Sequence, residues 1–278
     1  MRYLVIGKAQ VDELSRRTSG LQLRTQPERG PRGRDLRLGD VARGAADAFA
    51  EVLWPTRCAG CDQPGELLCD ECRASLPWVE QRLACPSCGA PYGYLTCTEC
   101  DGGWVPRATV AALTFRGTAA RAVTALKDAH ELRLAPVVAA AMACALEEAS
   151  AWPARDGGPR FSPAETDALC FVPATAAAYA RRGFDHMELV SRALASELSL
   201  PLADVLVRAA ARDQRELGRD ERSANLAGTM RSLEDVAGAR LLVVDDVATT
   251  GASLAEAARA LLLRGAASVT ACVLARVW

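Results

Sequence analysis

Short, mostly apolar runs recur along the chain from residue 109 onward. The clearest run is Leu241 to Val244, and the others lie at 109–115, 168–172, 203–207 and 269–274. Segments with helical spacing of apolar residues separate several of them, at 121–127, 134–148, 187–197 and 254–263. Uninterrupted apolar strands are typical of parallel sheets that helices cover on both faces. The alternation therefore predicts an α/β fold with a mostly parallel sheet over residues 105–278.

The beginning of the chain has a different pattern. Residues 1–38 carry arginines among proline, glycine and polar residues, so we expect a disordered basic tail, with a nucleic-acid-binding arm as the alternative. Residues 41–53 have the spacing of a short amphipathic helix that ends before Pro55. We expect this helix and the cysteine-rich stretch after it to form a separate domain over residues 39–104.

Two further expectations concern the larger domain. Residues 208–225 are dense in charge and lie between predicted strands, which indicates either a mobile lid or a solvated helix face. Cys144, Cys170 and Cys272 stand among apolar residues and are expected to be buried in the core.

Composition and charge narrow the function classes. The apolar fraction of 50% is enough for a substantial core, and the formal net charge of −1 gives no overall electrostatic footprint for nucleic acid. Nucleic-acid binding would then need a local patch. The sequence contains no apolar run of about 18 residues, the usual length of a membrane span. We expect a soluble cytoplasmic protein without a membrane partner.

The cysteines indicate metal. Eight of the 11 cysteines form Cys-x-x-Cys pairs within one short stretch. They are Cys58, Cys61, Cys69, Cys72, Cys85, Cys88, Cys97 and Cys100. Two pairs complete a closed tetrahedral thiolate site, so the spacing predicts a double zinc ribbon with two structural Zn²⁺ ions. We prefer sequential pairing, with the first four cysteines in one site and the last four in the other; interleaved pairing stays open.

The most informative stretch follows the apolar run at 241–244. Asp245 and Asp246 come directly after it, and a loop of small and hydroxyl residues then leads into a helix. The loop residues are Val247, Ala248, Thr249, Thr250, Gly251, Ala252 and Ser253. A small-residue turn at a helix N-terminus suits a phosphate, whereas a carboxylate pair suits hydroxyl groups or a cation. Together they predict a site for a ribose 5-phosphate.

A second half-site is expected after the run at 168–172. Pro173 and Ala174 follow that run, and Arg181 and Arg182 come shortly afterwards. These arginines could face a pyrophosphate, or they could be a solvated pair at a helix end. His186 is expected more often at the surface than in a site, and His130 still more so.

These motifs occur in an order that resembles the ComF family. The resemblance rests on the Cys-x-x-Cys pairs, Phe115-Arg116-Gly117, Lys127, Arg182-Gly183-Phe184, the segment Gln214 to Asn225 and the Asp-Asp-x-x-Thr-Thr-Gly loop. It implies a zinc ribbon joined to a type I phosphoribosyltransferase-like parallel sheet with helices on both faces. The ligand would be phosphoribosyl pyrophosphate (PRPP) with Mg²⁺. Asp245 and Asp246 would hold the ribose hydroxyls, and Arg182 or Arg222 would stabilise the leaving pyrophosphate.

Two functions remain open from the sequence. The first is an enzyme that transfers the phosphoribosyl group to an unidentified acceptor. The second is a non-catalytic accessory protein of DNA uptake and competence, whose ribbons bind single-stranded DNA or a partner such as a helicase. Base stacking would need aromatic side chains, and the ribbon region offers Trp78, Tyr92, Tyr94 and Trp104. We expect these four to pack in a small core rather than to stack on bases.

Overall fold

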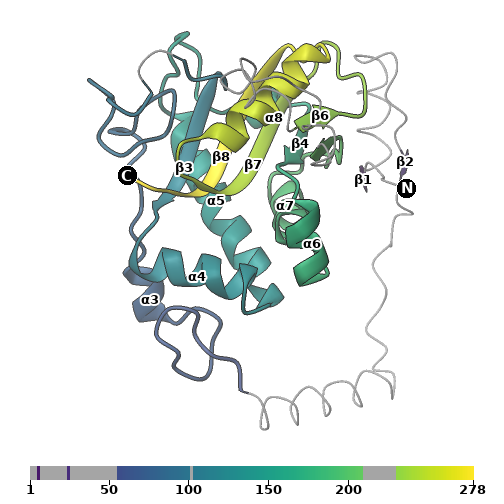
Figure 1. Cartoon of the computed structure of the whole chain (residues 1–278). Helices are drawn as coiled ribbons and strands as arrows, with labels where there is room; N and C mark the ends of the chain where they lie inside the picture. The colour runs from purple at the N-terminus through teal and green to yellow at the C-terminus, as the bar shows by residue number, and fades with distance from the viewer. Residues whose placement is uncertain (1–4, 7–23, 26–54, 101–102, 209–229) are drawn as a thin grey trace, which may run out of the picture.

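A four-stranded parallel sheet forms the centre of the molecule. The computed structural model describes residues 5–6, 24–25, 55–100, 103–208 and 230–278. The strands lie in the order β3 (Ala108–Thr114), β8 (Ser268–Arg276), β7 (Arg240–Ala248) and β4 (Ala168–Phe171), and each neighbouring pair is parallel (Figure 1). The predicted α/β architecture is thereby confirmed.

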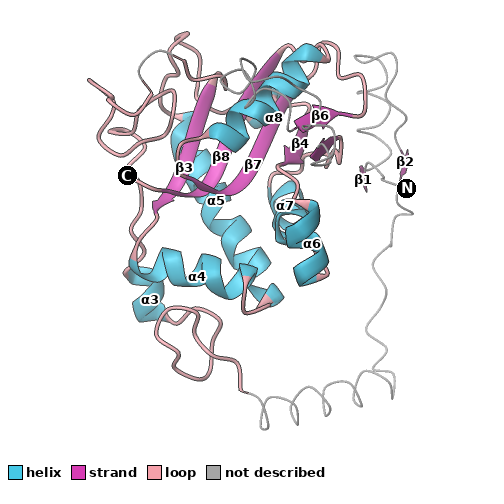
Figure 2. Ribbon diagram, viewed as in Figure 1, coloured by secondary structure: helices cyan, strands magenta, loops and turns pink. Residues whose placement is uncertain are grey.

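Helices cover both faces of this sheet. The helices of the larger domain are α4 (Gly117–Lys127), α5 (Ala135–Ser150), α6 (Ala176–Arg182), α7 (His186–Glu197) and α8 (Ala252–Leu263). Helices α4, α5 and α7 share one hydrophobic cluster with the sheet, and α8 packs in a second cluster on the other face. Figure 2 shows α8 in front of the strands and α5 behind them. Short 3₁₀ turns occur at η1 (Leu132–Leu134) and η2 (Pro163–Glu165).

The apolar run in β7 supplies both clusters because successive side chains of a strand point to opposite faces. Leu242 and Val244 belong to the cluster with α5 and α7, whereas Leu241 and Val243 belong to the cluster with α8. All four side chains are buried. Burial on both faces explains why this strand reads as an uninterrupted aliphatic run.

The strand predicted at 203–207 is shifted toward the C-terminus and lies outside the central sheet. Strand β5 covers Leu206–Arg208 and pairs antiparallel with β6 (Met230–Ser232) in a separate two-stranded sheet. Residues 201–203 instead run beside β4, where Leu169 and Leu202 form an isolated bridge. Nearly all of the charged segment 208–225, including Arg222, lies outside the described residues.

The cysteine-rich region packs directly against the larger domain. Its one described helix element, α3, spans Asp70–Ala74. The segment Pro77 to Val79 lies along the free edge of β3, where Val79 N donates to Ala112 O and Thr114 N donates to Pro77 O. Arg160 is fully buried and donates to the carbonyls of Gln81 and Ala84 at 2.6 and 3.0 Å.

The disordered tail stays a prediction, the expectation for Cys144 is wrong, and one helix was not predicted. In the segment expected to be disordered, β1 (Val5–Ile6) pairs with β2 (Arg24–Thr25), while residues 1–4, 7–23 and 26–54 lie outside the described residues. Cys144 is exposed rather than buried, because it lies on a solvent-facing position of α5. Helix α6 had no predicted counterpart. Among the described residues, no helix combines the length and apolarity needed to cross a bilayer.

Candidate functional site

The two adjacent carboxylates lie within β7 rather than after it. The strand continues to Ala248, so Asp245 and Asp246 point to opposite faces near its carboxyl end. Each carboxylate also accepts a hydrogen bond from the following amide: Asp246 N donates to Asp245 Oδ1 at 2.9 Å, and Val247 N donates to Asp246 Oδ1 at 2.6 Å. These bonds hold the two side chains close to the strand end, where open α/β sheets bind ligands.

Asp246 has two cationic or potentially cationic neighbours. Lys127 Nζ, from the last residue of α4, lies 2.5 Å from Asp246 Oδ2, and His186 Nε2, from the first residue of α7, lies at the same distance. Burial alone would raise the pKa of Asp246. The hydrogen bond from His186 and the charge of Lys127 outweigh burial and lower this pKa to about 2. Asp246 is therefore ionised at neutral pH.

The pKa of Asp245 is shifted in the opposite direction. Burial, followed by the charge of Asp246 beside it, raises the pKa of Asp245 to about 8, although Lys127 and Arg208 oppose the shift. A pair of neighbouring carboxylates with pKa values pushed apart in this way is common at functional sites. A cation at Asp245 would favour its ionised form.

The loop after β7 turns into α8 at Gly251. Gly251 adopts a left-handed conformation with φ of 77° at the N-cap of α8, and Thr249 and Thr250 are exposed beside it. Glycine tolerates this φ without strain, which residues with a Cβ do not. The hydroxyls of Thr249, Thr250 and Ser253 and the positive end of the 12-residue helix therefore share one corner of the site.

Arg208 connects this loop to the predicted second half-site. Its Nε donates to Pro173 O at 2.8 Å, and its Nη2 lies 3.5 Å from Ser253 Oγ. Pro173 and Ala174 follow β4, which is the parallel neighbour of β7. The structure thus brings the predicted residues 173–174 and 245–253 to one edge of the sheet.

Asp185 holds the loop after β4 in place. Its Oδ2 accepts from Ala174 N at 2.7 Å, and its Oδ1 accepts from Met187 N at 2.9 Å, which caps α7. One carboxylate therefore fixes both the turn beside Asp246 and the start of the helix that carries His186.

The two arginines of α6 lie at the side of the site rather than over it. Arg182 is nearly buried, with Nη1 3.5 Å from His186 Nδ1 and Nη2 3.4 Å from Asp128 Oδ1, whereas Arg181 is exposed. Together with Lys127, Asp128 and His130 they line an open cleft of about 630 Å³. The cleft is predominantly basic, so it suits an anion.

Two residues that contact Asp246 were missed as site residues. His186 was expected at the surface but is buried against Asp246. Lys127 entered only as part of the family resemblance, although its amine contacts the same carboxylate oxygen. Neither contact has a local sequence signal, because Lys127 and His186 are 119 and 60 positions from Asp246 in the chain.

The eight paired cysteines form two separate tetrads. In each tetrad the sulfur atoms lie within 4.8 Å of one another, and the members are Cys58, Cys61, Cys69 and Cys72 in one and Cys85, Cys88, Cys97 and Cys100 in the other. Sequential pairing is thus the arrangement in the structure. Four thiolates at this separation fit tetrahedral Zn²⁺ and leave no protein-side position open, as in structural zinc sites.

Neighbouring backbone amides favour the thiolate form of Cys58 in the first tetrad. Cys58 Sγ accepts from the amides of Gly60 and Cys69, each at 3.3 Å, and despite burial these bonds contribute to a pKa of about 6. In the second tetrad, a guanidinium nitrogen of Arg155 lies 3.8 Å from Cys100 Sγ, although burial and the neighbouring Cys85 raise the pKa of Cys100 to about 11. Thiolates rather than thiols bind the metal, so these donors support zinc binding.

Comparisons with known proteins match two separate parts of the chain. A double zinc ribbon domain matches residues 49–102, and a phosphoribosyl transferase domain matches residues 188–277. A protein named DNA utilization protein YhgH from Salmonella typhi is 31% identical over 233 residues, which cover 80% of this chain and 97% of that protein. The protein of the same name from Escherichia coli K12 is 34% identical over 112 residues, 40% of this chain and 49% of its own length.

A solved structure of hypoxanthine phosphoribosyl transferase from Trypanosoma cruzi is also similar, at 14% identity with a TM-score of 0.30, covering 52% of this chain and 64% of that one. The identity and coverage of the Salmonella relative establish the relationship over most of the chain. With a double zinc ribbon followed by a phosphoribosyl transferase domain, this chain belongs to the ComF family.

Proposed function

We propose that the protein binds PRPP, or a closely related ribose 5-phosphate ligand, together with Mg²⁺ at the carboxyl edge of β4 and β7. The main observation behind this proposal is the order of chemical groups at the carboxyl end of β7. Asp245 and Asp246 come first, the hydroxyl-rich loop 249–253 follows, and the N-terminus of α8 completes the edge. Carboxylates and a phosphate-binding helix start are the two chemistries that a ribose 5-phosphate requires.

In the proposed complex, the 5′-phosphate binds the loop 249–253. The ionised Asp246 accepts hydrogen bonds from ribose hydroxyls, and Asp245 faces Mg²⁺ or a hydroxyl. The pyrophosphate end extends toward Pro173 and Ala174, with Arg182 and the basic cleft beside it. Arg222 remains a predicted contributor.

A phosphoribosyl transfer is the reaction that this arrangement would support. Pyrophosphate would leave C1 of the ribose as an acceptor attacks, and positioning with charge stabilisation would supply most of the rate enhancement. Lys127, Arg182 and Arg208 are among the described cations around the two half-sites. The acceptor remains to be identified.

Calorimetry tests the binding proposal. PRPP with Mg²⁺ is titrated into zinc-loaded protein and into the variant Asp245→Ala plus Asp246→Ala. A matched control replaces the exposed neighbours Glu234 and Asp235 by alanine, since they lie in the turn before β7. We expect saturable binding by the wild type and the control and none by the site variant. A folded wild-type protein that fails to bind would refute the proposal.

A second candidate function, binding of single-stranded DNA, is favoured by an aromatic surface. Trp78, Tyr92 and Tyr94 are 46%, 69% and 45% exposed, so the expectation that they pack in a ribbon core is wrong for these three. Trp278 is 61% exposed and its ring centroid lies 5.7 Å from that of Tyr92. Exposed aromatic rings can stack on bases, which is the main sequence-tolerant contact with single strands.

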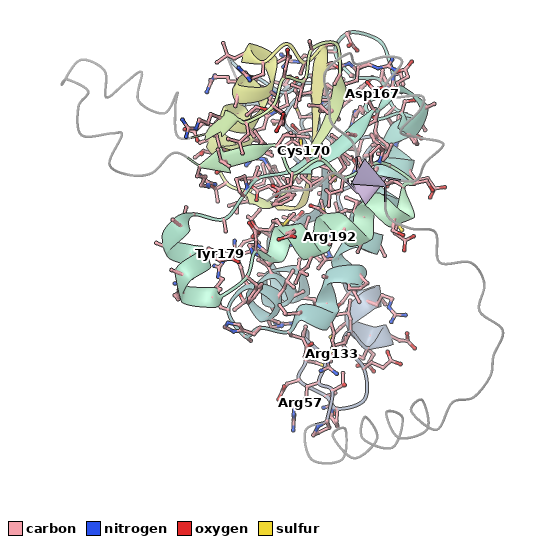
Figure 3. The ribbon with its side chains drawn as sticks, turned by 90° about the vertical axis from the view of Figure 1, so that its right-hand side faces the viewer. Arg57, Arg133, Asp167, Cys170, Tyr179 and Arg192 are labelled. Atoms are coloured by element: carbon pink, nitrogen blue, oxygen red, sulfur yellow. The ribbon has the colours of Figure 1, made fainter. Side chains whose placement is uncertain are left out.

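An anisotropy titration with a labelled single-stranded oligonucleotide tests this second function. The variants are Tyr92→Ala and Trp278→Ala, and the control is Tyr179→Ala, an exposed tyrosine on α6 that Figure 3 shows away from the sheet. Loss of affinity only in the first two variants, with a steep salt dependence, would support the proposal. Equal affinity in all three variants would contradict it.

A further inference from the structure

Trp104 lies between the second cysteine tetrad and the loop 248–253, which is called the phosphate loop below because the proposed 5′-phosphate would bind there. Its ring packs against the cluster that contains Cys97 and the other three cysteines of that tetrad. On its other side the ring fills the space beside Gly251, where a Cβ atom would lie only 1.9 Å from the indole. Trp104 Nε1 donates to Thr109 Oγ1 at 2.8 Å, which fixes the ring on β3.

Arg276 makes a second connection between the same two places. Its side chain is 1% exposed, and its Nη1 donates to the carbonyls of Ala248 and Thr249, at 3.0 Å for Ala248. Its Nη2 lies 3.8 Å from Glu99, the residue before Cys100, and its guanidinium carbon lies 5.7 Å from the centre of the Trp104 ring. Arg276 therefore binds the backbone at the start of the phosphate loop and also contacts Glu99 and Trp104 at the second ribbon.

The first tetrad has no such connection among the described contacts. Its surroundings are α4 and α5: a Cβ at Gly60 would meet both Cys72 and Thr118, and Val137 packs against its cluster. Ser75 Oγ, just after α3, lies 3.3 Å from Thr118 Oγ1. The two tetrads thus differ in what lies against them, and the first serves as an internal control.

We propose that zinc binding at Cys85, Cys88, Cys97 and Cys100 is thermodynamically coupled to sugar-phosphate binding in the loop 248–253. This inference rests on the proposed ligand. Ribbons of this size fold with their metal, so zinc sets the positions of Glu99 and Trp104. Those two residues contact Arg276, and the Trp104 ring lies directly against Gly251. The loop is then preorganised for a phosphate, and ordering it costs less on binding.

Coupling of this kind is reciprocal. If zinc in the second site tightens sugar-phosphate binding, the sugar phosphate must tighten zinc binding in that site by the same factor. Coupling between two sites typically changes affinity by roughly 5- to 150-fold, and we expect about 10-fold here. The first tetrad should show no change.

Differential alkylation measures the zinc protection of both cysteine tetrads in the same protein sample. Full-length zinc-loaded protein is treated with a zinc-selective chelator and N-ethylmaleimide, with and without PRPP and Mg²⁺, and mass spectrometry measures labelling of each cysteine. We expect the ligand to slow labelling of Cys85 to Cys100 about 10-fold and to leave Cys58 to Cys72 unchanged. Equal effects on both tetrads, or no effect in a protein that binds PRPP by calorimetry, would overturn the coupling while leaving the proposed function intact.

Variants test the route of the coupling with both zinc ions in place. Trp104→Leu and Glu99→Gln should reduce ligand protection of the second tetrad, and Glu66→Gln, an exposed glutamate of the first ribbon, is the matched control. Unchanged protection in both variants would overturn the assigned route. Absence of PRPP binding by the wild type would overturn both this inference and the proposed function, and calorimetry distinguishes that result from loss of coupling alone.

Discussion

Lys127 Nζ lies 2.5 Å from Asp246 Oδ2, so a residue at the end of α4 neutralises the second carboxylate of the β7 pair. His186 contacts the same oxygen from α7. The carboxylate is thus paired before any ligand arrives. A ribose hydroxyl that binds Asp246 must share or replace one of these contacts.

Replacing Lys127 by methionine should destabilise the protein at neutral pH. In the wild type, the lowered pKa of Asp246 contributes stability that is present above pH 4 and is lost as the pH falls toward 2. We expect the variant to lose about 2 kcal/mol at pH 7 and to approach the wild type only near pH 2, because protonation of Asp246 then removes the ion pair. Thermal melts at both pH values measure this.

The matched control for that change is Arg121→Met, on the same helix. Arg121 is exposed, and its one described contact is a 3.5 Å approach to Thr118 Oγ1. An equal loss of stability in the two variants at pH 7 would show that the pairing with Asp246 is not the cause.

Replacing Asp245 by asparagine should have the opposite effect on stability. The pKa of Asp245 is raised to about 8, so the folded state binds a proton more tightly than the unfolded chain does. Stability from this group is complete below pH 4 and falls as the pH rises toward 8. The variant should therefore exceed the wild type by at least about 1 kcal/mol at pH 8 and match it near pH 4. Urea denaturation at the two pH values would show a constant difference if the burial of Asp245 were unimportant.

The same raised pKa predicts proton release on ligand binding. A divalent cation at Asp245 favours the ionised carboxylate, so binding of PRPP with Mg²⁺ near pH 7 should release up to one proton. Titration in buffers of different ionisation enthalpy measures this number. Asp245→Asn should reduce it, and an unchanged proton count in that variant would place the titrating group elsewhere.

Gly60→Ala should prevent zinc binding at the first tetrad and leave zinc binding at the second tetrad unchanged. The added Cβ would lie 2.4 Å from Cys72 Sγ, closer than any relaxed contact allows. Gly103→Ala provides a control near the second tetrad, because no atom lies within 4 Å of its Cβ position. Metal analysis should give one zinc ion per chain for the first variant and two for the second. Two zinc ions in Gly60→Ala would contradict the tetrad geometry.

Arg160→Met should lower the stability of the protein more than replacement of a surface arginine does. Arg160 is fully buried and donates to three carbonyls, those of Gln81, Ala84 and Pro153. Removing it leaves buried acceptors unpaired, with an expected loss of about 3 kcal/mol. Arg57→Met is the control, since Figure 3 shows Arg57 at the outer end of the first ribbon and its ion pair with Asp62 is exposed. Equal melting temperatures of the two variants would contradict this assignment.

The sequence predicted the parts of the site that are local in the chain. The loop 245–253 has its carboxylates, hydroxyls and glycine within nine residues, and the cysteines have a fixed short spacing. Contacts between distant segments could not be predicted in this way. Lys127, His186 and Arg208 reach the site only because α4, α7 and β5 pack around the end of β7.

Strand assignments failed for a related reason. The run at 203–207 is apolar apart from Asp204, and Ala203, Val205 and Leu206 are buried. Their burial comes from the hydrophobic cluster that they share with β7 and α8, not from a place in the central sheet. Hydrophobicity reports burial, whereas the hydrogen-bonding partner of a strand depends on the whole topology.

The segment Pro77 to Val79 along β3 also has a consequence for how the chain folds during synthesis. The ribbons precede β3 in the chain, so they leave the ribosome before the strand whose edge they cover. An uncovered edge strand pairs readily with other chains. Metal-loaded ribbons would therefore shield β3 from aggregation as soon as it emerges, and zinc starvation of a growing cell would lower the yield of folded protein before it affects any molecule already made.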